Sequence, residues 1–342
     1  MIGIGVIGYG YWGPNLVRNF AECNGAAVRA VCDARPERLA QVERRYPGVA
    51  VTTSAAELME RSDVDAVVIA TPVDRHFDLG MAALKAGKHV LIEKPIASTS
   101  EQASRLIDEA AARQKVLMVD HTFVYTGAVR KMRALVEAGE LGDIYYYDSV
   151  RINLGLFQHD VNVLWDLAVH DLAIMDYVLP QRPVGVSATG LAHVQGRPQN
   201  IAYMTMFFQD SLIAHVHANW LSPVKVRQTL LGGSRRMVVF DDLEASEKIK
   251  IYDRGISLNP SPENVYQMLI GYRTGDMHAP QLAVTEALKV EAEHFVECVA
   301  TGIRPLTDGE AGLRVVQLLE AATASMARQG QQITLSSQAA QA

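Results

Sequence analysis

The chain opens with an apolar segment that runs directly into a glycine-rich turn. Residues 2–7 have the character of a buried strand, and residues 8–13 read GYGYWG. This matches the pattern G-x-G-x-x-G, whose glycines allow a tight turn, close approach of the backbone to a pyrophosphate and close packing of the next helix. A helical stretch follows at residues 15–22. The order of strand, glycine turn and helix predicts the first unit of a dinucleotide-binding fold.

An acidic residue follows the second predicted strand, residues 28–32. Asp33 lies 20 positions after Gly13, where a carboxylate can accept hydrogen bonds from the adenosine ribose of a bound dinucleotide. Its charge would repel a 2′-phosphate, so NAD is favoured over NADP. Arg35 and Arg38 leave room for NADP, because an arginine can accommodate that phosphate. The alternative is a glycine turn without a ligand and an Asp that only caps the next helix.

Short apolar runs alternate with helix-like stretches over the first third of the chain. Near-continuous apolar strands are typical of a parallel sheet that helices cover on both faces. The alternation predicts right-handed crossovers and a doubly wound α/β fold. The other predicted strands here are residues 66–70, 89–92 and 116–119, and the other helices are residues 36–45, 75–86 and 100–114.

The pattern changes after residue 121. Several strand-like runs between residues 144 and 252 are joined by hairpin-like turns, which predicts a large, mostly antiparallel open sheet. Further helices are predicted at residues 128–138, 163–177, 285–300 and 311–329. We therefore expect a dinucleotide-binding Rossmann domain at residues 1–121, an α+β substrate-binding and oligomerisation domain at 122–335, and a flexible tail at 336–342.

The composition excludes several other classes of protein. Of the 342 residues, 49% are hydrophobic and 20% are charged, which is ordinary for a globular chain and excludes a disordered one. A net charge of −6 gives no overall attraction to nucleic acid or to an anionic membrane. No apolar run reaches the roughly 18 residues of a membrane helix. The three cysteines form no CxxC pair, so no disulfide framework is expected and a cytoplasmic location fits.

Glu93, Lys94 and Pro95 directly follow the predicted strand 89–92. Lys94 thus lies at the carboxyl end of a strand, where open α/β sheets bind their ligands. An ammonium group there can hydrogen-bond a substrate hydroxyl and stabilise negative charge that develops on its oxygen. Composition alone favours the plainer interpretation, a surface lysine in a proline-containing turn.

Asp166 and His170 are four positions apart on a predicted helix, so they share one face of it. A histidine, whose pKa lies near neutrality, is suited to take the proton that an alcohol loses as its carbon loses hydride. Asp166 could orient the ring or stabilise its charged form, although the spacing also fits an ordinary pair on a helix surface. No metal site is expected, because the sequence contains no H-x-E-x-x-H or Cys/His array.

Together these segments resemble the glucose–fructose oxidoreductase / inositol dehydrogenase / MocA family. The resemblance runs almost end to end. Besides the glycine loop and the Asp33 region, it rests on ATP at residues 70–72 with His76, AGKHVLIEKP at 86–95, WDLAVHD at 165–171 and RPLTDGEAGLRVV at 304–316. It implies a Rossmann domain followed by an α+β domain whose sheet mediates a homodimer or homotetramer.

The resemblance also implies roles for individual residues. Lys94 corresponds to the catalytic lysine, His170 to the proton-transferring histidine and Asp166 to its partner near the substrate hydroxyls. This outweighs the plainer interpretation of Lys94. The residues expected at the cofactor are Gly8, Gly10, Tyr11, Trp12, Gly13, Asp33, Arg35, Arg38, Thr71, Pro72, His76, Glu93 and Lys94. The residues expected at the substrate are Lys94, Arg151, Asn153, Asn162, Asp166 and His170.

The expected reaction interconverts a hydroxyl and a ketone on a sugar or nucleotide-linked sugar, with neither nucleic acid nor membrane as partner. The WDLAVHD segment is similar to dehydrogenases of nucleotide-sugar and polysaccharide metabolism. Many relatives have a Gly-Gly pair just before the position of Asp166, where this chain has residues 163–165, VLW, and this difference bears on the substrate. Asn219 and Trp220 suit polyol hydrogen bonding and packing on a sugar.

The alternative functions are a cyclitol dehydrogenase, an NAD-dependent glycosidase of the same fold, and a regulator without catalysis. The presence of both Lys94 and His170 argues against the regulator.

Overall fold

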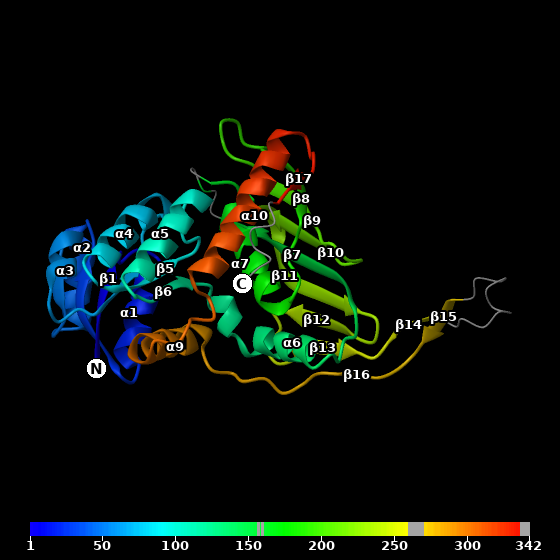
Figure 1. Cartoon of the computed structure of the whole chain (residues 1–342), viewed down its shortest axis with the longest axis horizontal. Coiled ribbons are helices and arrows are strands. Elements are labelled where there is room, and N and C mark those ends of the chain that lie inside the picture. Colours follow the sequence, from blue (N-terminus) through cyan, green and yellow to red (C-terminus); the bar gives the residue numbers. More distant parts are fainter. Residues whose placement is uncertain (156–157, 159–160, 259–269, 336–342) are drawn as a thin grey trace. The chain divides into compact units, whose positions relative to one another are not determined.

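The computed structural model describes residues 1–155, 158, 161–258 and 270–335, and the chain divides into two compact units. Unit 1 comprises residues 1–126 and 285–320, and unit 2 comprises residues 127–284 and 321–342. Each unit contains its own sheet (Figure 1). Over the described residues, no helix combines the length and the apolar character that crossing a membrane requires.

Unit 1 is built on a six-stranded sheet in the order β3-β2-β1-β4-β5-β6. All neighbouring strands pair in parallel, which confirms the predicted doubly wound sheet. The strand order reverses between β1 and β4, and sheets of this kind bind ligands outside the carboxyl ends of the strands at such a point. The strands are β1 (Ile2–Ile7), β2 (Ala26–Cys32), β3 (Ala50–Thr52), β4 (Ala66–Ile69), β5 (His89–Glu93) and β6 (Leu117–Asp120).

The sequence itself sets where several helices of unit 1 begin. Helices α1 and α2 each have a proline in the first turn, where no N–H is needed. Ser54 and Thr99 cap α3 and α5 by accepting hydrogen bonds from the N–H groups of Glu57 and Gln102 at 3.3 and 3.2 Å. The helices that follow the strands are α1 (Gly13–Glu22), α2 (Pro36–Arg45), α3 (Ala55–Glu60), α4 (His76–Lys85) and α5 (Ser100–Ala112).

The last part of unit 1 comes from near the end of the chain. Helix α9 (Ala287–Thr301) packs on α1, where the buried rings of Phe20 and Phe295 meet edge to face with centroids 6.0 Å apart. Beyond α9, the carbonyl oxygen of Thr307 accepts a 2.8 Å hydrogen bond from the N–H of Val119 in β6. The Thr307 hydroxyl donates a 2.7 Å hydrogen bond to the carbonyl oxygen of Val119. The predicted second domain includes residues 285–320, whereas the structure packs them with unit 1 through these contacts. Helix α10 (Gly309–Ala327) starts in this segment.

Unit 2 contains a nine-stranded sheet in the order β16-β13-β12-β11-β7-β10-β9-β8-β17. Every neighbouring pair is antiparallel except β7 and β10, so the predicted mostly antiparallel sheet is confirmed. The strands are β7 (Ile144–Leu154), β8 (Gly185–Leu191), β9 (Ile201–Phe207), β10 (Ile213–Asn219), β11 (Leu221–Gly233), β12 (Met237–Asp241), β13 (Ile249–Tyr252), β16 (Met277–His278) and β17 (Ile333–Thr334). A separate two-stranded ladder pairs β14 (Gly255–Leu258) with β15 (Ile270–Arg273).

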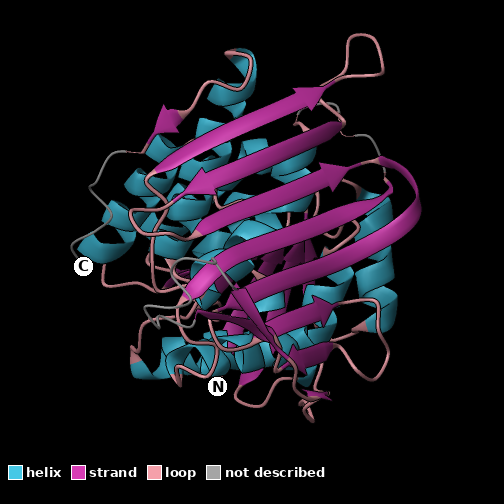
Figure 2. Ribbon diagram, turned by 90° about the vertical axis from the view of Figure 1, so that its right-hand side faces the viewer, coloured by secondary structure: helices cyan, strands magenta, loops and turns pink. Residues whose placement is uncertain are grey.

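The two faces of the nine-stranded sheet differ. Helix α7 (Val169–Val178), which packs with α6 (Gly127–Glu137), covers one face, where Tyr147 and Ser149 of β7 donate hydrogen bonds to Asp171 at 2.9 and 2.6 Å. Figure 2 shows the other face, in which no helix crosses in front of the central strands. This open face carries Tyr203 and Ile213, which are 43% and 45% exposed.

Candidate active site

The glycine loop has the geometry that a pyrophosphate requires. Gly8 has a φ of +99°, and a Cβ added there would lie 2.4 Å from the carbonyl oxygen of Ala70. A Cβ at Gly13 would lie 2.1 Å from the carbonyl oxygen of Gly8, so α1 can pack this closely on the turn only without a side chain. At Gly10, a Cβ would meet only the guanidinium end of Arg38. The loop therefore fits a dinucleotide phosphate at the start of α1.

Asp33 lies buried at the carboxyl end of β2. It accepts hydrogen bonds from the backbone N–H groups of Tyr9 and Arg35 at 2.7 and 2.9 Å. Burial alone would raise the pKa of Asp33, but these N–H groups and the Arg35 guanidinium together hold it below its usual value. Arg38 lies 3.9 Å from the carboxylate and donates to the carbonyl of Tyr9 at 3.0 Å. The Asp33 carboxylate thus lies between two arginines, and as an acceptor it suits the two hydroxyls of a ribose.

His76, predicted at the cofactor, is the first residue of α4 and is 1% exposed. Its Nδ1 lies 2.8 Å from the carbonyl oxygen of Pro95, and its Nε2 lies 2.8 Å from the carbonyl oxygen of Thr71. Burial lowers the pKa of His76, while the two carbonyl groups oppose this effect. The ring therefore joins the turn after β4 to the turn after β5.

Lys94 follows directly on β5, at the carboxyl edge of the sheet, as predicted. Its backbone N–H donates a 2.8 Å hydrogen bond to Oε2 of Glu93, and its peptide bond to Pro95 is cis. The strand register pairs Glu93 with Asp120 at the end of β6. Lys94 is thus held on a turn whose backbone is bonded on both sides, by Glu93 and by His76 through Pro95.

Acidic side chains gather beside this turn in a way that the sequence did not predict. Asp120 accepts hydrogen bonds from the indole Nε1 of Trp12 at 3.0 Å and from the Thr122 hydroxyl. Burial, and next the charge of Asp120, raise the pKa values of Glu93 and Glu291 well above their usual value. Asp120 could have been suspected as an acid at the end of a buried strand, but nothing in the sequence pairs Glu291 with it.

The described part of the chain contains no group of three or more His, Cys, Asp or Glu side chains that could hold a metal ion.

Asp166 and His170 belong to unit 2. Asp166 lies in a short π-helical turn, η3 (Leu164–Ala168), which leads directly into α7, where His170 is the second residue. Oδ2 of Asp166 accepts a 2.9 Å hydrogen bond from the indole of Trp220. Trp220 is fully buried, so this side chain holds Asp166 and does not offer a surface for a sugar.

Two further predicted substrate residues, Arg151 and Asn162, also have structural partners. Arg151, 2% exposed, donates to both carboxylate oxygens of Asp171 at 2.6 and 3.3 Å. Asn162 accepts hydrogen bonds from the N–H groups of Leu164 and Trp165 at 3.0 and 3.4 Å, which caps the start of η3. Asn153 lies half-buried near the end of β7. A role of these residues toward a substrate stays a prediction.

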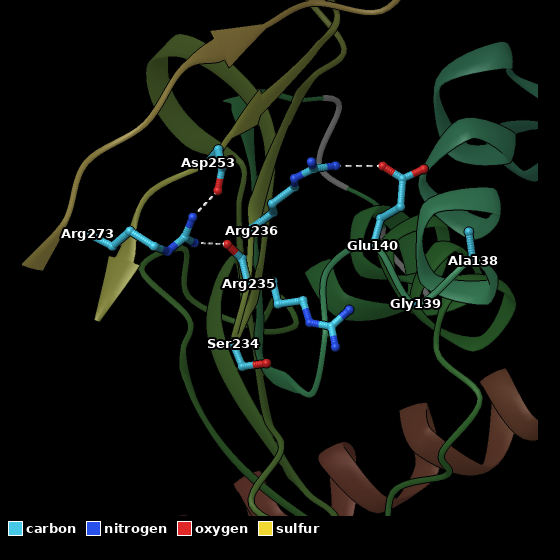
Figure 3. A pocket seen from close by; sticks show the side chains of 8 residues that line it. All are labelled: Ala138, Gly139, Glu140, Ser234, Arg235, Arg236, Asp253 and Arg273. Carbon is cyan, nitrogen blue, oxygen red and sulfur yellow. Dashed lines mark hydrogen bonds and ion pairs between the residues drawn. The ribbon is translucent and has the colours of Figure 1, made fainter. Parts of the chain in front are cut away.

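An open pocket of about 420 Å³ in unit 2 contains none of the predicted site residues. Figure 3 shows Arg236 joined to Glu140 and Arg273 joined to Asp253, while the Arg235 side chain extends below both pairs, toward the side of Gly139. The first pair is 2.7 Å apart. The lining residues are Ala138, Gly139, Glu140, Ser234, Arg235, Arg236, Asp253 and Arg273.

Family models match both the first and the second predicted domain of the chain. Residues 2–121 match the model of an oxidoreductase family with an NAD-binding Rossmann fold, and residues 129–239 match that of the GFO/IDH/MocA C-terminal domain. The UDP-N-acetylglucosamine 3-dehydrogenase of Acidithiobacillus ferrooxidans is 31% identical over 315 residues, which cover 91% of this chain and 93% of that protein.

Two further comparisons extend over nearly the whole length. A solved structure of the same Acidithiobacillus enzyme has a TM-score of 0.80 at 30% identity and covers 96% of this chain and 99% of its own. Inositol 2-dehydrogenase of Rhizobium meliloti is 25% identical over 339 residues, which cover 96% of this chain and 97% of that protein. The predicted family resemblance is confirmed.

Proposed function

Since the chain belongs to the glucose–fructose oxidoreductase / inositol dehydrogenase / MocA family of NAD-binding oxidoreductases, we propose that it interconverts a hydroxyl and a ketone on a nucleotide-linked sugar. The observation that carries the proposal is the place of Lys94, at the carboxyl end of β5 in a sheet whose order reverses between β1 and β4. The match to a dehydrogenase of UDP-N-acetylglucosamine over 91% of the chain supports the substrate class.

The cofactor, when bound, accepts or returns the hydride. In the oxidising direction, His170 takes the proton of the substrate hydroxyl, because a neutral imidazole is a base of suitable strength. Lys94 donates a hydrogen bond to the same oxygen and stabilises the negative charge that develops on it. Asp166, held by Trp220, orients the substrate hydroxyls and the His170 ring. In the reducing direction, the same two groups return the proton and polarise the carbonyl.

The residues of unit 1 account for cofactor binding. The glycine loop with Tyr11 and Trp12 would hold the pyrophosphate, and Asp33 would accept hydrogen bonds from the adenosine ribose. Thr71, Pro72, Glu93 and Lys94 would lie toward the nicotinamide half. Thr71 and Pro72 follow β4, Glu93 is the last residue of β5, and Lys94 follows it. NAD is the proposed cofactor, and Arg35 and Arg38 are the groups that would meet the 2′-phosphate of NADP.

The proposal is tested with the variants Lys94→Ala and His170→Ala. NADH formation is followed by absorbance with UDP-N-acetylglucosamine, free N-acetylglucosamine and myo-inositol, and NAD⁺ binding is measured separately by calorimetry. Loss of a general base or of an oxyanion donor costs about 10²–10⁴-fold in turnover. We expect such a loss in both variants with NAD⁺ affinity retained, and wild-type turnover in both would refute the assigned roles.

A cyclitol dehydrogenase is the second candidate, because an inositol 2-dehydrogenase matches 96% of the chain. Turnover of myo-inositol but not of the UDP-sugar would select it. Cleavage of a glycoside without net NADH accumulation would instead indicate the glycosidase chemistry that some relatives of this fold use.

We further propose that unit 2 forms a homodimer or homotetramer through the open face of its nine-stranded sheet. The exposed Tyr203 and Ile213 on that face support this, and the Tyr203 ring stacks on His217 with centroids 4.4 Å apart. Light scattering of the variant Ile213→Glu tests it, with a shift to monomer expected.

A cytoplasmic location is proposed as well, supported by free, buried thiols at Cys23, Cys32 and Cys298.

A further inference from the structure

The imidazole of His76 occupies an unusual position between two turns of unit 1. It is 1% exposed, and each ring nitrogen lies 2.8 Å from a backbone carbonyl oxygen, of Pro95 on one side and of Thr71 on the other. These carbonyls belong to the turns that follow β5 and β4, which are neighbouring strands of the sheet. One side chain therefore connects two segments that both lie at the carboxyl edge where the cofactor is expected.

Both contacts are made to acceptors, which restricts what the ring can do. A carbonyl oxygen can only accept, so a ring nitrogen facing it forms a hydrogen bond when it carries a hydrogen. Burial lowers the pKa of His76, while the two carbonyl groups and Asp74 favour the charged ring and Lys94 opposes it. A neutral imidazole carries a hydrogen on one nitrogen only, so both hydrogen bonds form together only in the charged ring, which the two carbonyls favour and burial opposes.

The consequence for Lys94 follows from its place in the turn. Its own N–H is bonded to the Glu93 carboxyl, and the carbonyl of the next residue, Pro95, faces His76. The backbone is thus held immediately before and after the side chain that is proposed to meet the reacting oxygen. A turn held at both ends fixes that side chain more closely than one held at one end.

We propose that His76, with a hydrogen on each ring nitrogen, is a positioning residue with two separate tasks: Nδ1 fixes the turn that carries Lys94 for the chemical step, and Nε2 fixes the Thr71 turn for cofactor binding. The first task rests on the role proposed for Lys94, whereas the second does not depend on it. His76 acts through the backbone of these turns and does not touch the reactants.

Two isosteric variants separate the tasks. An asparagine amide nitrogen can take the place of Nδ1, and a glutamine amide nitrogen can take the place of Nε2. His76→Asn keeps the bond to Pro95, so kcat should stay within about threefold of wild type while the Kd for NAD⁺ rises about tenfold. His76→Gln keeps the bond to Thr71, so the Kd for NAD⁺ should stay within about threefold while kcat falls about tenfold or more. His76→Leu should show both losses.

Calorimetry with NAD⁺ alone and steady-state assays with UDP-N-acetylglucosamine measure the two effects. His89→Asn is the matched control: His89 starts β5 at the opposite edge, and its Nδ1 accepts a 3.0 Å hydrogen bond from Val116. This control should lower Tm without changing kcat or the Kd for NAD⁺. Equal losses in the Asn and Gln variants, or none in either, would show that His76 only fills space and would overturn the proposal.

A measurement on the wild-type protein keeps the proposal testable if the variants do not fold. Nitrogen-15 NMR of histidine-labelled protein should show a hydrogen on each ring nitrogen of His76, protected from exchange with water. A ring that exchanges freely, or one with a hydrogen on only one nitrogen, would overturn the inference. If Lys94→Ala keeps wild-type turnover, the assigned role of Lys94 fails, while the NAD⁺ affinities of the His76 variants still decide the task of Nε2.

Discussion

The indole nitrogen of Trp220 donates a 2.9 Å hydrogen bond to Oδ2 of Asp166. The two residues are 54 positions apart, and the indole packs so closely on Gly155 that a Cβ there would lie 2.6 Å from the ring. A fully buried donor thus fixes the carboxylate that is proposed to orient the substrate. The orientation of Asp166 is built into the packing of the sheet.

Replacing Trp220 by Phe tests this relationship, because it keeps most of the packing and removes the donor. We expect kcat/KM for the sugar substrate to fall about tenfold and the free energy of unfolding to fall by about 1 kcal/mol. Trp165→Phe is the control, since its indole also donates to one side chain, Thr323, at 3.1 Å. An unchanged kcat/KM in Trp220→Phe would show that Asp166 does not need this bond.

The sequence predicts Arg151 at the substrate, whereas the structure pairs its side chain with Asp171. Its guanidinium is buried with Asp171 at 2.6 Å, so Arg151→Ala leaves an uncompensated buried carboxylate. We expect the free energy of unfolding to fall by about 3–5 kcal/mol in urea denaturation. A raised KM for the sugar with unchanged stability would instead favour the predicted contact between Arg151 and the substrate.

Individual residues show which features of the fold and of the site could be predicted from the sequence. The strand-turn-helix order around Gly8 and the place of Lys94 after β5 were predictable, because both depend on local pattern and on a rule about strand ends. The packing of α9 on α1 was not, because Phe20 and Phe295 meet only through the tertiary fold. The same is true of Arg151, which has the chemistry of an anion-binding residue in the sequence and is buried against Asp171 in the structure.

The pH dependence of stability should be governed in part by Glu291. Burial, with Asp120 and Glu93 nearby, raises its pKa in the folded state well above its usual value of 4.5. The folded protein then holds a proton that the unfolded chain releases, so this contribution is fully present below about pH 4.5 and is lost as pH rises through the folded pKa. Glu291→Gln cannot ionise, so its stability should decline less than that of wild type between pH 5 and 9. Parallel curves of unfolding free energy against pH would contradict this assignment.

The choice between NAD and NADP should depend on Asp33. Its carboxylate has a lowered pKa and is therefore charged at neutral pH, where it repels a 2′-phosphate. Asp33→Asn removes the charge and keeps an oxygen that can accept from the N–H of Tyr9 or Arg35. With Arg35 and Arg38 beside it, the variant should bind NADP⁺ at least about tenfold more tightly than wild type does, which is about 1.4 kcal/mol. Adding Arg35→Ala and Arg38→Ala to this variant should abolish the gain. If NADP⁺ affinity does not change in Asp33→Asn, the charge of Asp33 is not what selects the cofactor.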